Sequence, residues 1–158
     1  MRGLLSGGLA VFAGMVAIPA ELSTAQSPAV PVRDYRSDPR LESLRRFFQK
    51  TACPALAYSK AFLEAADRYA LDWRLLPSIS IVESSGGKAA SHNNLFGWDS
   101  GRAQFSSPTA GIHAVGYRLA HSELYRNKNT DGILATYNPA DGYAVKVKQV
   151  MRSIARSQ

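Results

Sequence analysis

Apolar residues recur at intervals of three and four along most of this chain, and this spacing is the strongest constraint on its fold. Leucines and phenylalanines between residues 41 and 48 occupy positions i, i+3, i+6 and i+7, and a similar stripe returns between 147 and 154. Such spacing places apolar side chains on one face of an α-helix. We therefore expect a mainly α fold, with helices over 39–50, 55–70 and 72–84, a further helix from 108, a short turn at 131–136 and a last helix from about 141.

Prolines mark the starts of several of these helices. Asp38-Pro39 and Ser107-Pro108 each pair a residue that can cap a helix with a proline that fits the first turn. Pro77 would lie inside the helix expected over 72–84, where proline is poorly tolerated beyond the first turn. A start closer to Leu76 is therefore an open alternative for that helix.

Helical periodicity disappears between residues 91 and 107. Asn, Gly, Asp and Ser dominate this stretch, and Asp99-Ser100-Gly101 is a plausible turn between two short extended pieces. We expect one small β-hairpin here, beside the active-site groove, which makes the complete fold class α+β.

The first 25 residues are typical of a secretory signal peptide. A short basic start precedes the apolar run 9–20, and small residues at 23–25 suit cleavage before Gln26. A membrane anchor is the alternative, but the run is shorter than the roughly 18–20 residues that span a bilayer. We expect 1–25 to be removed, 26–38 to be a flexible lead-in and 39–158 to be one domain. The mature protein would then be secreted or periplasmic, without stable membrane insertion.

The charge and the cysteine count limit the partners and the chemistry. The net charge of +7 suits a polyanionic surface such as a bacterial cell wall, and charge alone would equally permit nucleic acid. The basic residues are scattered and match no nucleic-acid-binding module, so we do not expect nucleic acid as a partner. Cys53 is the only cysteine, which excludes an internal disulfide and suggests a small buried residue.

No pattern indicates a metal or another cofactor. His113 and His121 share a helix face with Tyr117, but two helical turns separate the histidines, so packing is the better interpretation. We expect no cofactor.

The most informative single residue is Glu83, a carboxylate at the end of an otherwise apolar helix. In the helix expected over 72–84 it shares a face with Leu76 and with Ile79 or Ser80. A carboxyl group among apolar side chains can remain protonated near neutral pH and donate its proton to a leaving-group oxygen, as in the cleavage of sugar chains. An ordinary surface position at a helix end is the alternative for an isolated glutamate.

Two later segments combine amide and aromatic side chains in the way that sugar-binding surfaces do. The first contains Asn94, Phe96 and Trp98, and the second contains Asn138 and Tyr143. Amides can hydrogen-bond to hydroxyl and acetamido groups, and aromatic rings can stack on sugar rings. Packing in the core is the alternative for Phe96, whereas we expect Asn94 and Trp98 to face a groove.

The order of these motifs resembles that of a known group of enzymes. Leu71–Pro77, leading into Ile81–Gly86, resembles the catalytic-glutamate helix of the lysozyme-like superfamily. Asn93–Gly97 resembles a turn of the bacterial endo-β-N-acetylglucosaminidases of the flagellar type, and the ending Tyr137–Pro139 with Tyr143–Val147 resembles that family's last segment. Glu-Ser-Ser-Gly and Thr-Tyr-Asn also resemble soluble lytic transglycosylases. The resemblance covers roughly residues 55–155.

The resemblance implies an enzyme that cleaves β-1,4 bonds of peptidoglycan with Glu83 as the general acid, and we expect this enzyme to be a monomer. It also implies that Tyr137 lies near Glu83, and that Ser84, Asn94, Phe96, Trp98, Asn138 and Tyr143 contribute to substrate binding. The Gly-Leu-Met-Gln element of transglycosylases is missing, which favours the glucosaminidase branch. Glucosaminidases often have a second glutamate in the hairpin, where this chain has only Asp99.

Three functions remain open from the sequence. In a hydrolase, Asp99 could activate water for an inverting reaction if it lies roughly 6.5–9.5 Å from Glu83, and a closer pair would suggest a nucleophile. Glu83 could instead act alone, either in a lytic transglycosylase or in a hydrolase assisted by the substrate's acetamido group. The third possibility is a non-catalytic module that binds the cell wall.

Overall fold

The computed structural model describes residues 33–157, which form a helical unit. Its elements are α1 (Pro39–Lys50), a 3₁₀ helix η1 (Pro54–Tyr58), α2 (Ser59–Arg68), α3 (Leu75–Ser84), α4 (Pro108–His121), α5 (Thr130–Tyr137) and α6 (Tyr143–Ala155). The expected signal peptide, 1–25, and the first part of the expected lead-in, up to residue 32, lie outside the described residues.

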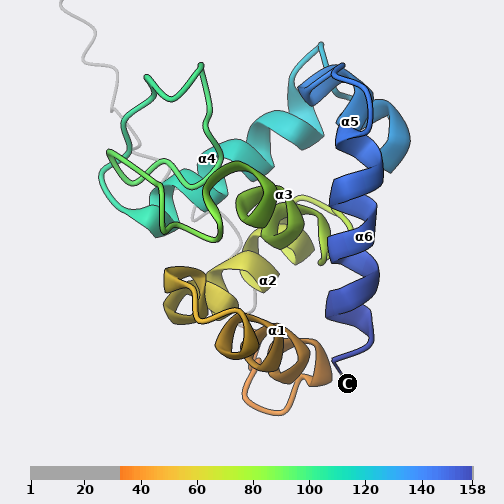
Figure 1. Cartoon of the computed structure of the whole chain (residues 1–158). Helices are drawn as coiled ribbons and strands as arrows, with labels where there is room; N and C mark the ends of the chain where they lie inside the picture. The colour runs from red at the N-terminus through yellow and green to blue at the C-terminus, as the bar shows by residue number, and fades with distance from the viewer. Residues whose placement is uncertain (1–32, 158) are drawn as a thin grey trace, which may run out of the picture. The chain divides into compact units, whose positions relative to one another are not determined.

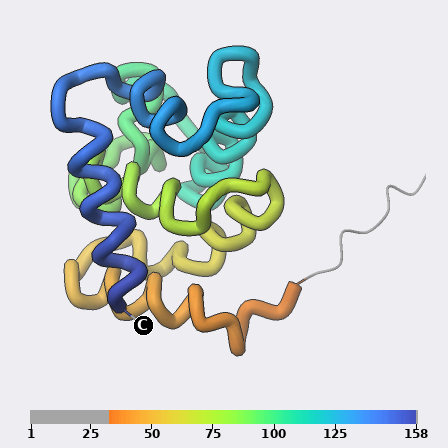
Figure 2. Tube along the Cα trace, turned by 90° about the vertical axis from the view of Figure 1, so that its right-hand side faces the viewer, coloured from red at the N-terminus to blue at the C-terminus, as the bar shows by residue number. Residues whose placement is uncertain are grey.

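Helix α3 is the centre of this unit (Figure 1). It packs against α6, which runs along one side of it, and against α2, which in turn packs against α4. Helix α1 contacts both α2 and α6, and α5 packs on α6 (Figure 2). The residues of α3 from Leu75 to Ser80 are all buried, whereas the three that follow, 81–83, are partly exposed.

Aromatic rings connect the helices in the core. Phe47, Phe48, Phe62 and Phe96 form a continuous row with centroid separations of 5.7–6.4 Å. Three of these rings, those of Phe48, Phe62 and Phe96, are completely buried. Burying a large apolar side chain stabilises a fold by roughly 1.5–3 kcal/mol, so this row is a substantial part of the core. Cys53 is a free, buried residue beside it, as expected.

The helix starts follow the capping signals in the sequence. The Asp38 carboxylate accepts a hydrogen bond from the Arg40 amide, and the Ser107 hydroxyl accepts one from the Ala110 amide. Pro77 is the third residue of α3, because this helix begins at Leu75, close to the later of the two expected starts. The helix expected over 55–70 is divided: a 3₁₀ turn precedes α2.

The prediction of a β-hairpin between residues 91 and 107 is wrong. Residues 85–107 connect α3 to α4 by successive turns, and no strand occurs between residues 33 and 157. The backbone takes positive φ angles at His92, Asn93, Gly97, Asp99, Ser100 and Gly101. Repeated positive φ curls the chain instead of extending it, so two strands cannot align as a ladder.

The last residues of the expected lead-in belong to the folded unit. Tyr35 is buried, and its hydroxyl donates a 3.0 Å hydrogen bond to Asp67 of α2. Arg33 and Arg40 also pair with Asp67. In the part of the chain that the structure describes, no helix has the length and apolarity needed to cross a membrane.

Candidate functional site

Glu83 lies in the last turn of α3, where the helix ends next to the 94–98 turn. Ser85 adopts a left-handed conformation and terminates the helix. The Ser84 hydroxyl lies 2.7 Å from the Leu95 carbonyl oxygen and donates to it. The backbone amide of Gly87 donates to the same hydroxyl at 3.0 Å. Ser84 is therefore buried between two segments, where it holds the end of α3 against the 94–98 turn.

The Glu83 carboxylate has one hydrogen-bond partner among residues 33–157, the hydroxyl of Tyr143. This phenol, from the first turn of α6, donates to Oε1 at 2.7 Å. This distance is usual for a well-formed hydrogen bond between two oxygens. Burial raises the pKa of the Tyr143 phenol well above its ordinary value, and the bond to Glu83 adds to this rise. The phenol is therefore a neutral donor at physiological pH.

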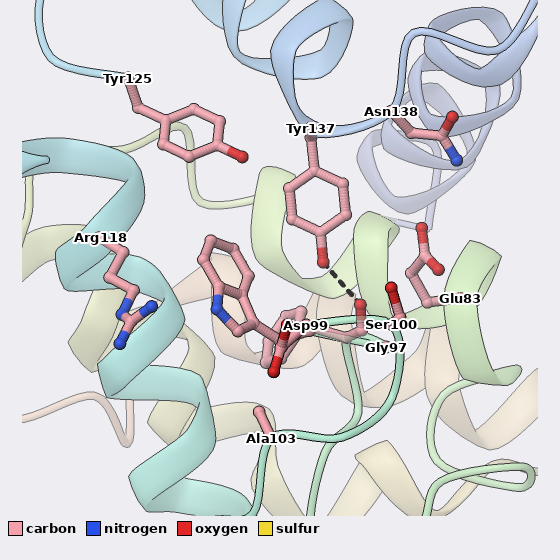
Figure 3. A pocket seen from close by; sticks show the side chains of 11 residues that line it. Glu83, Gly97, Asp99, Ser100, Ala103, Arg118, Tyr125, Tyr137 and Asn138 are labelled. Carbon is pink, nitrogen blue, oxygen red and sulfur yellow. Dashed lines mark hydrogen bonds between the residues drawn. The ribbon is translucent and has the colours of Figure 1, made fainter. Parts of the chain in front are cut away.

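Tyr137 lies next to Tyr143 but directs its hydroxyl elsewhere. The two rings stack with centroids 6.0 Å apart and planes 7° apart. The Tyr137 hydroxyl donates a 2.6 Å bond to the backbone carbonyl of Phe96 (Figure 3). Burial, followed by the nearby charge of Glu83, raises the pKa of this phenol as well. Tyr137 therefore lies near Glu83, as expected, but the phenol that hydrogen-bonds to the carboxylate is that of Tyr143.

Gly97 brings the backbone of the 94–98 turn against the other carboxylate oxygen. A Cβ atom at this position would lie 3.1 Å from Glu83 Oε2. Gly97 also has a φ of +59°, a conformation that favours glycine. The turn can approach the carboxylate this closely because residue 97 has no side chain.

A cavity of about 560 Å³ opens in front of Glu83. The residues that line it come from five segments of the chain: Glu83, Phe96, Gly97, Trp98, Asp99, Ser100, Ala103, Arg118, Tyr125, Tyr137 and Asn138 (Figure 3). Only two of them, Glu83 and Asp99, carry a carboxylate. The volume is in the range of small-ligand sites.

One wall of the cavity is aromatic. The Trp98 ring lies 5.7 Å from the Tyr137 ring and 6.3 Å from the Tyr125 ring. The guanidinium group of Arg118, on α4, lies over Trp98 at 5.5 Å from the ring centroid. In Figure 3, Arg118 and Glu83 lie on opposite sides of the cavity, with Tyr137 between them. The cavity therefore has a cation at one end, a carboxylate at the other and rings between.

Asp99 lies in the cavity lining, but another residue neutralises its charge. Its carboxylate forms a 2.7 Å ion pair with Arg102, and its side chain is 55% exposed. Asp99 also has a φ of +54°, so the turn that replaces the expected hairpin determines where it points. Such a carboxylate is well solvated and differs in environment from Glu83.

We expected Asn94 to face the cavity, but it is absent from the cavity lining. The residue is buried, and its side-chain amide donates to the carbonyl oxygens of Trp98 and Ala103 and accepts from the Trp98 amide. These three bonds hold the 97–103 turn closed. Asn94 thus positions Trp98, which does line the cavity.

The remaining expected site residues are divided between the core and the cavity. Phe96 is fully buried, and its carbonyl is the acceptor for Tyr137. Asn138 lines the cavity while its side-chain oxygen accepts from the Ala140 amide. Tyr143 is buried behind Glu83 and is absent from the lining.

Sequence reasoning did not identify Arg118 or Tyr125. Arg118 is the one arginine of α4 and belongs to no motif, and Tyr125 lies in a connection with no motif. Neither position has a local signal, because its place in the cavity depends on how α4 and the following segment pack.

The histidines of α4 belong to an aromatic cluster on another part of the unit. The rings of His113, Tyr117 and His121 all pack edge-on against Tyr69, at 5.9–6.0 Å. Among residues 33–157, no group of three or more metal-ligating side chains lies close enough to hold an ion. The cavity lining contains no histidine or cysteine, so the atoms there that could ligate a metal are the oxygens of two carboxylates and of hydroxyl, amide and backbone groups.

Comparisons with known proteins assign no relative: no protein-family model and no characterised protein matches the chain.

Proposed function

We propose that this protein is a secreted glycosidase that cleaves β-1,4 bonds of peptidoglycan, with Glu83 as the general acid. The observation that carries the proposal is the position of the Glu83 carboxyl group. It faces a cavity with an aromatic wall, with one oxygen held by Tyr143 and the other beside Gly97. The motif resemblance and the mainly helical fold, with the site at the end of α3, are compatible with a lysozyme-like architecture.

The aromatic wall suits a glycan. Sugar rings present apolar C–H faces that can stack on the rings of Trp98 and Tyr125. The protonated carboxyl group of Glu83 would donate its proton to the glycosidic oxygen as the bond to the anomeric carbon breaks. The leaving sugar departs with a new hydroxyl group, and positive charge develops on the sugar that remains.

The nucleophile that attacks this sugar depends on whether one carboxylate or two take part in the reaction. In a hydrolase with two carboxylates, Asp99 would remove a proton from the attacking water. Its ion pair with Arg102 and its exposure favour a route that needs Glu83 alone. In a lytic transglycosylase, the muramyl 6-hydroxyl attacks the anomeric carbon of the same sugar and closes an anhydro ring. The proton of this hydroxyl returns to the Glu83 carboxylate. A hydrolase assisted by the substrate's acetamido group also uses one carboxylate.

Digestion of purified sacculi tests the reaction. The protein should release soluble muropeptides, and Glu83→Gln should abolish the release while it preserves binding to sacculi, because the amide keeps the shape and loses the proton. Mass spectrometry of the products separates the two routes: reducing ends indicate hydrolysis, and anhydro-muramyl ends indicate transglycosylation. If the parent protein binds sacculi but releases nothing, it is a wall-binding module instead.

Asp99→Asn tests the second carboxylate. If Glu83 acts alone, this variant should retain most of its turnover. A fall of 100-fold or more, in the range expected for loss of a general base, would make Asp99 a catalytic residue. Arg102→Gln is the matched control, because it removes the partner of Asp99 and leaves the carboxylate.

A further inference from the structure

Arg118 has no ionic partner although it lines the cavity. None of the ion pairs formed within residues 33–157 involves Arg118. Arg102, in the 97–103 turn, is by contrast paired with Asp99. The Arg118 residue is exposed, and it lies at the end of the cavity away from Glu83 (Figure 3). An accessible guanidinium group at the end of a binding cavity is available to a ligand.

The contact with Trp98 prepares Arg118 for such a ligand. The guanidinium carbon lies 5.5 Å from the centroid of the indole, within the range of a cation–π interaction. This interaction restrains the side chain, and an aromatic face accepts no conventional hydrogen bond, so the N–H donors stay available. The planar donor set of arginine matches the two oxygens of a carboxylate.

Three aromatic rings of the site, those of Tyr143, Tyr137 and Trp98, connect the Arg118 cation to the proposed acid. The Tyr143 hydroxyl donates to Glu83, and the Tyr143 ring stacks on Tyr137. The Tyr137 ring contacts Trp98, and the guanidinium group of Arg118 lies over that indole. A glycan stacked along Trp98 with one glycosidic bond at Glu83 would present a substituent of a neighbouring sugar to Arg118. In peptidoglycan, the substituents that differ from those of a neutral glycan are carboxylates: the lactyl group of muramic acid or the acids of the stem peptide.

We propose that Arg118 is a specificity-determining residue that binds a carboxylate of the glycan substrate at the end of the cavity away from Glu83. The inference rests on the proposed function for the identity of the substrate. It predicts that the protein discriminates between anionic and neutral forms of the same glycan, and that Arg118 is responsible for most of this preference.

The test compares matched substrates. Peptide-free strands carry a free lactyl carboxylate, and peptide-bearing strands carry carboxylates only on their stem peptides. Each preparation is compared with the same preparation after conversion of its carboxylates to neutral methylamides. The measured quantity is the ratio of kcat/KM for the anionic form to that for the neutral form.

In Arg118→Gln, this ratio should fall about 10-fold or more for at least one preparation, as for loss of a hydrogen bond between charged groups. The preparation that shows the fall identifies the source of the carboxylate. Arg118→Lys should recover part of the ratio because it keeps the charge. Arg126→Gln is the matched control: it removes an exposed arginine outside the cavity lining and should leave the ratio unchanged.

An unchanged ratio in Arg118→Gln would overturn the inference. An equal fall in Arg126→Gln would also overturn it, because it would indicate attraction by net charge alone. Circular dichroism and the melting temperature establish that each variant is folded. Binding of the same strands, measured in the Glu83→Gln background, separates this inference from the proposed function. If the parent protein does not cleave strands but the binding preference depends on Arg118, then the proposed activity fails and the carboxylate site stands. If the binding shows no such preference, the carboxylate site fails.

Discussion

The hydrogen bond from Tyr143 to Glu83 makes a prediction that can be tested without knowledge of the substrate. Tyr143→Phe removes the donor and keeps the ring that stacks on Tyr137. Glu83→Met removes the acceptor and keeps a side chain of similar length. Because each change deletes one partner of a single contact, the double-mutant cycle isolates the interaction between them.

The magnitude follows from the geometry. A hydrogen bond contributes about 0.5–1.5 kcal/mol net, and up to about 3 kcal/mol where one partner is charged. The oxygen–oxygen distance of 2.7 Å and the burial of Tyr143 support the full range, whereas the partial exposure of Glu83 reduces it. We expect a coupling free energy of about 1–2 kcal/mol. With a urea dependence of about 1.5 kcal/mol per molar, this coupling corresponds to a midpoint difference of about 1 M.

Urea unfolding at pH 7, followed by circular dichroism, measures the four free energies of the cycle. Tyr137→Phe is the matched control, since it makes the same chemical change in the neighbouring ring and removes a bond to Phe96 instead. It should destabilise the protein without strong coupling to Glu83→Met. A Tyr143–Glu83 coupling below about 0.5 kcal/mol, which is the scatter of independent sites, would refute the reasoning.

Three further outcomes are expected. Gly97→Ala should destabilise the protein by about 1–2 kcal/mol, since it places a Cβ at positive φ and 3.1 Å from Glu83 Oε2, and thermal unfolding at the parent's stability would contradict this. Asn94→Ala should cost about 2–4 kcal/mol through its three lost hydrogen bonds and shift the tryptophan fluorescence to longer wavelength; an unchanged spectrum would mean that Asn94 does not hold the 97–103 turn. Hydrogen bonds and ion pairs with Arg40 lower the pKa of both Asp38 and Asp67 in the folded state, so their stabilisation is complete above the unfolded pKa of about 3.9 and is lost as the pH falls through the lower folded values. Urea unfolding between pH 7 and pH 2 should show this loss, and Asp67→Asn should make it smaller; an equal loss in the variant would exclude Asp67 as a source.

The helices were predictable because their signals are local. The apolar stripes, the Asp38 and Ser107 caps and the prolines of the first turns act within one or two turns of chain, and the observed helices begin within a few residues of the expected positions. The 91–107 segment was not predictable in the same way. Its glycines and asparagines suit several kinds of turn, and the buried amide of Asn94 helped to select the curled one.

The candidate site shows the same division. The sequence alone was sufficient to select Glu83 as the central residue, because a carboxylate at the end of an apolar helix is uncommon and the motifs around it are local. It could not assign the neighbours. Tyr137 and Tyr143 are both tyrosines close to the start of the last helix, and the packing of α5 and α6 determines which phenol reaches the carboxylate.

The sequence by itself therefore determined that this protein is mainly α-helical and that Glu83 is its most conspicuous carboxylate. The tertiary structure decided what surrounds that carboxylate: the Tyr143 donor, the close approach of Gly97, the paired state of Asp99 and the cation of Arg118 across the cavity. The physical reason is range. Capping and helical periodicity act over a few residues, whereas the cavity joins five segments whose meeting depends on the whole core.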